Sequence, residues 1–195
     1  MRVWLWLSCC LCLACSDSSK DPVPDDAAPE ADAGAPAAEG GQPVEDGICT
    51  TCDGCEEHLP VSSFNHVAGS IDYPDLPPAG GDHNQCWTTF GVHARELNDD
   101  YWVHNLEHGA VVYLHNCPDG CEEERQQLEA LADTRPFALV MPYAKLPTRF
   151  GVVAWEYRLL SDCLDESAFT EFYTDHVNRA RESSTSPPPS GCPVD

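Results

Sequence analysis

One stretch of this chain cannot fold on its own, and it confines any folded domain to the residues that follow it. Ser16 to Gly47 contains no aromatic residue and nine acidic residues against the single Lys20. Such a composition buries too little apolar surface to offset the entropy that ordering costs. We therefore expect an extended acidic linker over residues 15–47. The remaining residues 48–195 have a length that suits one domain.

The N-terminus has the pattern of an export signal. Arg2 gives a positive start, and Val3 to Ala14 is an uncharged, largely apolar run. That run is shorter than the roughly 20 apolar residues that cross a bilayer. We predict a signal peptide at residues 1–14 and lipid attachment to the thiol of Cys15, although Cys12 stands where an aliphatic residue is usual. The alternative is ordinary cleavage near Ala14, which would release a free secreted protein.

The charge of the domain limits its partners. Residues 48–195 carry 24 of the 33 acidic and 8 of the 10 basic residues, a formal charge of −16. Nucleic-acid binding needs clustered Lys and Arg, so we expect none. An anionic lipid surface would also repel the domain. We therefore expect a membrane partner through the lipid alone, in an extracytoplasmic protein anchored at a bacterial membrane, periplasmic or at the cell surface.

Cysteine number indicates an oxidised domain. An even number of cysteines in an exported chain favours disulfides, although sequence cannot choose their pairing. Cys49, Cys52 and Cys55 form two overlapping C-x-x-C units, but they precede no clear helix, so structural disulfides are the better interpretation than a redox dithiol. The eight disulfide candidates are Cys49, Cys52, Cys55, Cys86, Cys117, Cys121, Cys163 and Cys192.

Hydrophobic patterns predict an α+β fold. We expect one domain with a loop-rich N-terminal half, a mostly antiparallel sheet covered by two helices, and several disulfides. A thioredoxin-like arrangement is compatible with the element order, but no redox motif is recognised in a suitable place. The expected strands are 110–115, 137–141 and 152–160, and the expected helices are 121–133 and 165–181.

The run His104-Asn105-Leu106-Glu107-His108-Gly109 is the most informative motif. On a helix, imidazoles four residues apart lie on one face and can share a metal ion. The spacing also matches the H-x-x-E-H pattern of inverted zinc peptidases, in which the glutamate activates a metal-bound water. That motif needs a longer helix than Gly109 and the following strand pattern allow, so the peptidase interpretation is weaker.

Further histidines precede this run in the loop-rich segment. His66, His83, His104 and His108 are the candidate metal ligands if that segment wraps over the motif, and zinc or copper is the candidate ion. Glu107 would be an additional ligand or would orient one. The alternative is that these histidines are structural and bond to irregular backbone.

Several further motifs include the run from His104 to Gly109 or lie on either side of it. They are His66-Val67 with Gly69, Tyr73, the run from Pro77 to His83, Trp87 with Gly91, the run from Val103 to Val112, Val152 to Trp155, and the helix from Asp165. Through these pieces residues 58–182 resemble an uncharacterised bacterial family, domain of unknown function 3105. In this chain His93 stands where the family usually has Tyr, and Ala79 replaces a polar residue. The resemblance implies an exported or membrane-anchored protein and groups His66, His83, His104, Glu107 and His108 as one constellation, without implying an activity.

Three hypotheses for function follow. The first is a lipid-tethered domain that binds a transition metal through its histidine cluster. The second is a metal-dependent hydrolase in which Glu107 acts as general base. The third is a non-catalytic envelope protein with structural histidines. We lean away from an enzyme, and the convergence of the imidazole nitrogens separates these hypotheses.

Overall fold

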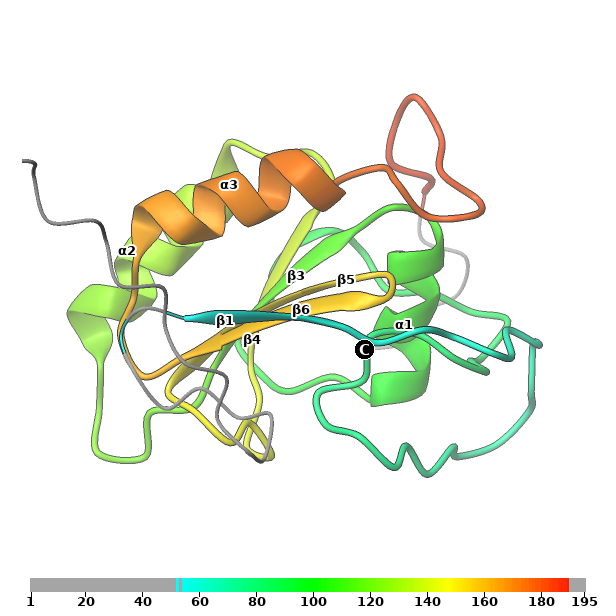
Figure 1. Ribbon diagram of the computed structural model, residues 1–195, viewed down its shortest axis with the longest axis horizontal. Coiled ribbons are helices and arrows are strands. Elements are labelled where there is room, and N and C mark those ends of the chain that lie inside the picture. The colour runs from blue at the N-terminus through cyan, green and yellow to red at the C-terminus, as the bar shows by residue number, and fades with distance from the viewer. Residues whose placement is uncertain (1–51, 53, 190–195) are drawn as a thin grey trace, which may run out of the picture. The chain divides into compact units, whose positions relative to one another are not determined.

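A six-stranded sheet organises the domain, which the computed structural model describes at residue 52 and residues 54–189 (Figure 1). The strand order is β1-β6-β5-β3-β4-β2. Three neighbouring pairs are antiparallel, and β4 runs parallel to both β3 and β2. The strands are β1 (Cys55–His58), β2 (Gly91–Val92), β3 (Val111–His115), β4 (Ala138–Pro142), β5 (Phe150–Ala154) and β6 (Tyr157–Ser161).

Three helices cover both faces of this sheet: α1 (Asp99–Glu107), α2 (Glu122–Asp133) and α3 (Glu166–His176). Successive side chains of a strand point to opposite faces, so the buried strand β3 serves two cores. Its Val112 and Leu114 pack in the cluster that contains Trp102 of α1. Val111 and Tyr113 pack in the cluster that contains residues of α2 and α3. The sheet therefore separates α1 from the other two helices.

The second half of the domain combines a parallel β-α-β unit with an antiparallel hairpin and a final helix. Strands β3 and β4 are parallel and joined through α2, the antiparallel pair β5–β6 follows, and α3 returns to the face that α2 covers. The sequence pattern was compatible with this arrangement. The strand order β6-β5-β3-β4 of this half results from the pairing of β3 with β5. These strands are far apart in the sequence, and no local pattern predicts that they pair.

Most expected elements of this half are confirmed, with one correction. The expected strands near 110–115 and 137–141 are β3 and β4, and the expected helix near 121–133 is α2. The single strand expected at 152–160 is wrong, because the chain reverses at Trp155–Glu156 to form the hairpin β5–β6. Glu156 adopts φ +68, and its N–H donates to the carbonyl of Ala79 at 2.6 Å. Tertiary contacts thus hold a turn that carries no glycine signal.

Other differences lie at the boundaries. Helix α3 ends at His176 rather than at 181, because Asn178 adopts φ +57 and donates its N–H to the carbonyl of Gly109. Helix α1 and strand β1 lie in segments where the sequence indicated only loops, short strands and a cysteine-rich lead-in. Helix α1 is nearly all buried and has little amphipathic pattern to reveal it.

Disulfides cross-link the described domain, as the cysteine number indicated. Cys52 pairs with Cys163, and Cys117 pairs with Cys121. Cys55 and Cys86 are disulfide-bonded as well. Cys49, Cys192, the lipidation candidate Cys15, the expected signal peptide and the whole expected linker lie outside the described residues. Within the described part of the chain, the helices are all too short or too polar to span a bilayer.

Candidate metal centre

Two loop segments pair to bring His66 and His83 together. The two residues form an isolated parallel bridge. The N–H of Val67 donates to the carbonyl of His83 at 2.8 Å, and the N–H of His83 donates to the carbonyl of Asn65 at 3.0 Å. These backbone bonds fix the spacing of two side chains that lie 17 positions apart in the sequence.

Helix α1 supplies the other half of the site. His104 and Glu107 lie one helical turn apart, so they project from the same face of α1. Both are almost completely buried, as is His83, whereas His66 is exposed. A histidine pair and a carboxylate so deeply buried need polar partners within the protein or a bound ion.

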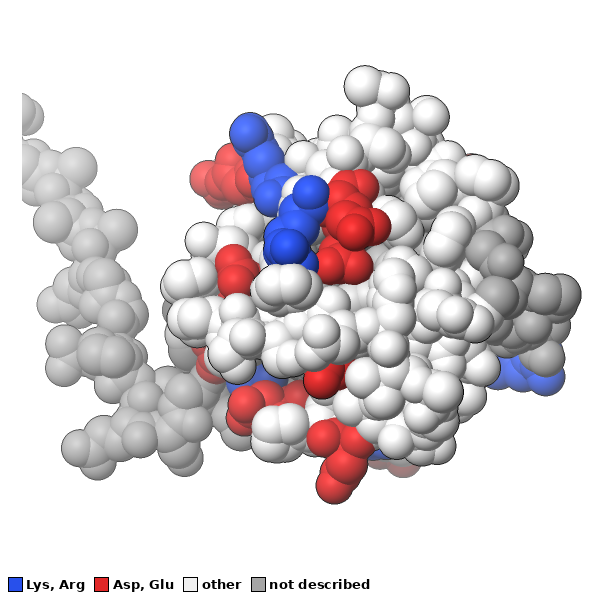
Figure 2. All heavy atoms as spheres, turned by 90° about the vertical axis from the view of Figure 1, so that its right-hand side faces the viewer, with Lys and Arg blue, Asp and Glu red and all other residues white. Residues whose placement is uncertain are grey.

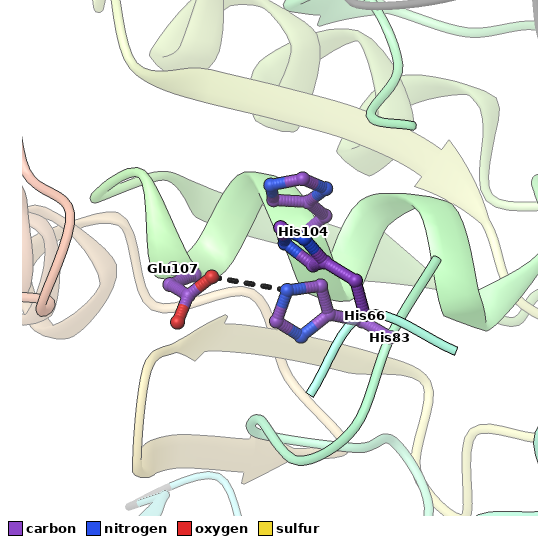
Figure 3. Close-up of side chains that lie close together, drawn as sticks. All are labelled: His66, His83, His104 and Glu107. Carbon is purple, nitrogen blue, oxygen red and sulfur yellow. Dashed lines mark ion pairs between the residues drawn. The ribbon is translucent and has the colours of Figure 1, made fainter. Parts of the chain in front are cut away.

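The four side chains converge (Figure 3). One ligand atom from each of His66, His83, His104 and Glu107 lies within 4.8 Å of the others, and the group could hold a metal ion. The ring centroids of His66 and His104 are 4.7 Å apart, and those of His83 and His104 are 4.6 Å apart. Such spacing matches imidazoles that share one ion with bonds of about 2.0–2.1 Å.

Backbone carbonyls determine which ring nitrogens face the cluster. Nδ1 of His83 lies 2.8 Å from the carbonyl oxygen of Gly81, and Nδ1 of His104 lies 2.8 Å from that of Asn84. A carbonyl only accepts hydrogen bonds, so each Nδ1 carries the proton. In the neutral rings, Nε2 then presents a lone pair. Orientation of metal-binding histidines through the second ring nitrogen is a common feature of metal sites.

Glu107 faces one of these lone pairs. Its Oε2 lies 3.0 Å from Nε2 of His83, and its Oε1 lies 3.4 Å from Nη1 of Arg181. The first contact is an ion pair only if His83 carries a second proton, and Nε2 of neutral His83 has no hydrogen-bond partner. With the ring neutral, two acceptors face each other, an arrangement that a cation would stabilise.

Electrostatics keep His104 neutral. Burial, reinforced by the neighbouring His83, His108 and His66, lowers the pKa of His104 to about 3. The ring therefore keeps its Nε2 lone pair at neutral pH, without the proton that would compete with a metal.

Asn105, between the two site residues of α1, is a positioning residue that sequence reasoning missed. Its Oδ1 accepts from the N–H of Thr88 at 3.0 Å, and its Nδ2 donates to the carbonyl of Thr88 at 3.0 Å. Both residues are buried. The bidentate clamp ties α1 to the loop that follows Asn84, whose carbonyl orients His104. The signal that could have identified it in the sequence is its amide side chain, which directly follows His104 in the motif.

His108 does not join the group around Glu107. It belongs to a second group with His104 and Glu182, whose ligand atoms also lie within 4.8 Å of one another. The rings of His104 and His108 stack with centroids 4.8 Å apart, and Nε2 of His108 is buried without a hydrogen-bond partner. His93 is half-buried and lies outside both groups, with Nε2 2.9 Å from the carbonyl of Thr89.

The site is covered on one side and open on another. Arg181 lies over the ring of Phe64 at 3.3 Å and reaches Glu107, so the segment after α3 forms a cover. Trp87 stands edge-on to His104 and His108 and donates Nε1–H to the carbonyl of Pro189. Beside the exposed His66, a cavity of about 200 Å³ lined by residues 66–69, 84 and 85 gives access from solvent.

Comparison with known protein families identifies one match. A family described as "Protein of unknown function (DUF3105)" matches residues 66–190. The chain belongs to this family. The matched region contains all the residues of both candidate groups, from His66 to Glu182. No curated protein and no solved structure matches the chain. Family membership therefore covers the region that holds the candidate groups and assigns it no activity.

Proposed function

We propose that this protein is an exported, membrane-tethered lipoprotein whose domain binds a transition-metal ion through His66, His83 and His104. Glu107 is a fourth ligand or orients His83. One observation carries the proposal: Nε2 of His83 faces Oε2 of Glu107 at 3.0 Å in a buried setting, while its Nδ1–H is already donated. Two acceptors so arranged favour a cation between or beside them.

Zinc or copper suits these donors best. Neutral imidazole binds zinc, copper, nickel and iron, and a carboxylate completes a four-ligand set that zinc accepts. Thiolate ligands are not available from the described cysteines, because each of them is disulfide-bonded. When bound, the ion would supply charge to neutralise the buried carboxylate.

Metal binding is tested with the full oxidised protein. Metal content by mass spectrometry and affinity by calorimetry with zinc and with copper would be compared between the wild type and His83→Ala, with His93→Ala as the matched control. We expect binding by the wild type and by the control, and a loss of affinity of at least about 100-fold in His83→Ala. Negligible binding by the wild type, or equal binding by all three proteins, would refute the proposal.

The hydrolase alternative is weaker. A general base must reach a water at the metal, but one oxygen of Glu107 faces His83 and the other faces Arg181. Its side chain is 2% exposed, and the segment with Arg181 and Glu182 covers it. A metal-binding role needs no such access.

The structural-histidine alternative predicts imidazoles that bond only to backbone, whereas Nε2 of His83 and of His104 are free of such bonds among the described residues.

Attachment to the membrane is proposed through Cys15, which lies outside the described residues. Metabolic labelling with an alkyne fatty acid would be compared in the wild type, Cys15→Ala and Cys12→Leu. The first variant should lose the label and leave the membrane fraction. The second, with an aliphatic residue at the usual position, should keep both. Equal labelling of all three proteins, or none, would exclude the anchor.

No nucleic-acid partner is proposed. The charge of −16 over residues 48–195 opposes phosphate binding. On the face of the domain that Figure 2 shows, basic side chains are few and the most prominent lie beside acidic ones. A lipid-anchored protein with this charge would be repelled by an anionic headgroup surface and held at a distance from it.

A further inference from the structure

The Cys117–Cys121 disulfide lies where the central strand β3 passes into helix α2. We propose that this disulfide is redox-active and exchanges with the dithiol of another protein. Cys121 is the N-cap residue of α2, and the intervening Pro118, Asp119 and Gly120 are exposed. The site is separate from the histidine cluster, which packs on the α1 side of the sheet.

The position on the fold favours a thiolate at Cys121. Helix α2 has 12 residues and begins directly after this cysteine, whose carbonyl accepts the N–H of Arg125 at 2.8 Å. A helix N-terminus stabilises negative charge and lowers the pKa of a thiol placed there. The C-x-x-x-C pair thus occupies a strand-to-helix junction, the usual position of a redox dithiol, whereas the sequence around Cys49 to Cys55 shows no clear helix.

The two sulfur atoms differ in exposure. Cys121 is 8% exposed and packs in the core beneath α2 and α3, whereas Cys117 is only partly buried and adjoins the exposed loop tip. An incoming thiolate therefore reaches Cys117 first. Exchange is fastest when the accessible sulfur is attacked and the other leaves as a stabilised thiolate, and this pair has that asymmetry.

His115 lies beside the disulfide. A ring nitrogen of His115 and the sulfurs of Cys117 and Cys121 lie within 4.8 Å of one another. Burial, followed by the charge of Arg125, lowers the pKa of His115, so its ring is neutral and adds no positive charge beside the sulfurs. Three glutamates in the first turn of α2 oppose a thiolate, but Glu122 is paired with Arg125 and Glu124 with Arg149.

A purely structural role explains this disulfide less well. Cross-links stabilise a fold in proportion to the logarithm of the loop they close. Cys52–Cys163 joins residues 111 positions apart, whereas Cys117–Cys121 joins residues four apart, within a connection that β3 and α2 already hold. The short bridge therefore restrains the unfolded chain much less.

The exchange balances without a further reagent. One thiolate of the partner dithiol attacks Sγ of Cys117, the Cys117–Cys121 bond breaks, and Cys121 leaves as a thiolate. The second partner thiol loses its proton to solvent and attacks the mixed disulfide as a thiolate, which releases Cys117. The partner is oxidised to a disulfide and loses two electrons, and Cys117 and Cys121 become a dithiol that holds the two protons.

Selective reduction of the full oxidised protein tests the proposal. Dithiothreitol, the probe dithiol, would be added under native conditions, and free thiols would be alkylated at intervals and located by mass spectrometry. We expect Cys117 and Cys121 to be reduced at least about tenfold faster than Cys52 and Cys163, with unchanged circular dichroism. Equal rates, or reduction only after unfolding, would overturn the proposal.

A pair of serine variants tests the assigned roles. With glutathione disulfide as the probe, Cys121→Ser leaves the accessible Cys117 free, and Cys117→Ser leaves the buried Cys121 free. We expect the mixed disulfide to form at least about tenfold faster in Cys121→Ser. Equal rates, or the reverse order, would contradict attack at Cys117. Folding of each variant is checked by its circular dichroism, and the wild-type reduction decides the proposal if either fails to fold.

Discussion

Nε2 of His83 lies 3.0 Å from Oε2 of Glu107, and the two side chains are 0% and 2% exposed. Since Nδ1 of the same ring donates to the carbonyl of Gly81, the contact joins two acceptors when the ring is neutral. With a neutral ring, this contact lowers the stability of the metal-free protein, and a bound metal ion would remove that cost. A change at Glu107 should therefore affect these two forms in opposite directions.

Glu107→Gln should stabilise the metal-free protein and weaken metal binding. The amide can donate its N–H to Nε2 of His83 and keep its oxygen toward Arg181, a gain of about 1 kcal/mol in the free energy of unfolding. Loss of the carboxylate should lower metal affinity by at least about tenfold. Urea unfolding in a chelator and calorimetry with zinc measure the two effects.

Glu182→Gln is the control for this substitution, because Glu182 is 54% exposed and should change the free energy of unfolding by less than about 0.5 kcal/mol. The opposite result is equally informative. If His83 and Glu107 form a buried ion pair in the metal-free protein, removal of one charge would destabilise it by about 3–5 kcal/mol.

Asn105→Ala should destabilise the domain by about 3 kcal/mol. The substitution leaves the buried N–H and carbonyl of Thr88 without their partners, and each unsatisfied group costs about 1–3 kcal/mol. Asn116→Ala is the matched control, because its side chain also makes two hydrogen bonds to the backbone, to the carbonyls of Ala144 and Leu146, but is partly exposed. Thermal and urea unfolding of both variants give the comparison, and equal losses would argue against the clamp.

Gly109→Ala should loosen the cover over the metal site. Gly109 has φ +90, and a Cβ there would lie 2.7 Å from the Cα of Asn178. Gly69→Ala shares the backbone strain, at φ +97, but its Cβ meets nothing within 4 Å. We expect about 1 kcal/mol of destabilisation in Gly69→Ala and about 2 kcal/mol more in Gly109→Ala. Gly109→Ala should also make the segment after α3 more sensitive to limited proteolysis. Equal stability and equal proteolysis of the two variants would exclude the close packing of Gly109 against Asn178.

Acid should destabilise the domain partly through His115. Burial lowers the pKa of His115 in the folded state, so below its ordinary pKa of about 6.5 the unfolded state binds more protons. This contribution to stability is full above about pH 6.5 and is lost as the pH falls below it. His115→Gln should therefore flatten the pH dependence of the free energy of unfolding between about pH 6.5 and 5, by at most about 1.4 kcal/mol per pH unit.

The measurement is urea unfolding across that pH range, with the disulfides intact. His93→Gln is the control, since it removes a half-buried histidine whose ring lies against the carbonyl of Thr89 rather than beside His115. We expect the change in slope to be specific to His115→Gln. A parallel shift of the whole curve in His115→Gln, without a change in slope, would show that the residue acts by packing rather than by titration.

Local patterns were sufficient for β3, α2 and β4, because each has a propensity and a periodicity that its tertiary setting supports. They were insufficient for α1. All of its residues from Asp100 to Glu107 except Tyr101 are buried, so polar and apolar side chains alternate without a helical stripe. They also failed at Trp155–Glu156, where hydrogen bonds from distant loop residues stabilise a reversal.

The same division applies to the sites. The H-x-x-x-H spacing drew attention to His104 and His108, but only the former reaches the buried carboxylate of Glu107. Cys117 and Cys121 were recognised only as disulfide candidates, because their place between a central strand and a helix depends on the order of the sheet.

The sequence by itself determined the α+β class, the disulfide-rich domain after an acidic segment, and the residue types of the histidine cluster. Composition and short-range periodicity carry that information. Only the tertiary structure decided which histidines meet, that Glu107 lies buried against His83, and that Cys121 starts a helix. Those relationships arise from pairing between loops and strands far apart in the chain, and no local pattern encodes such pairing.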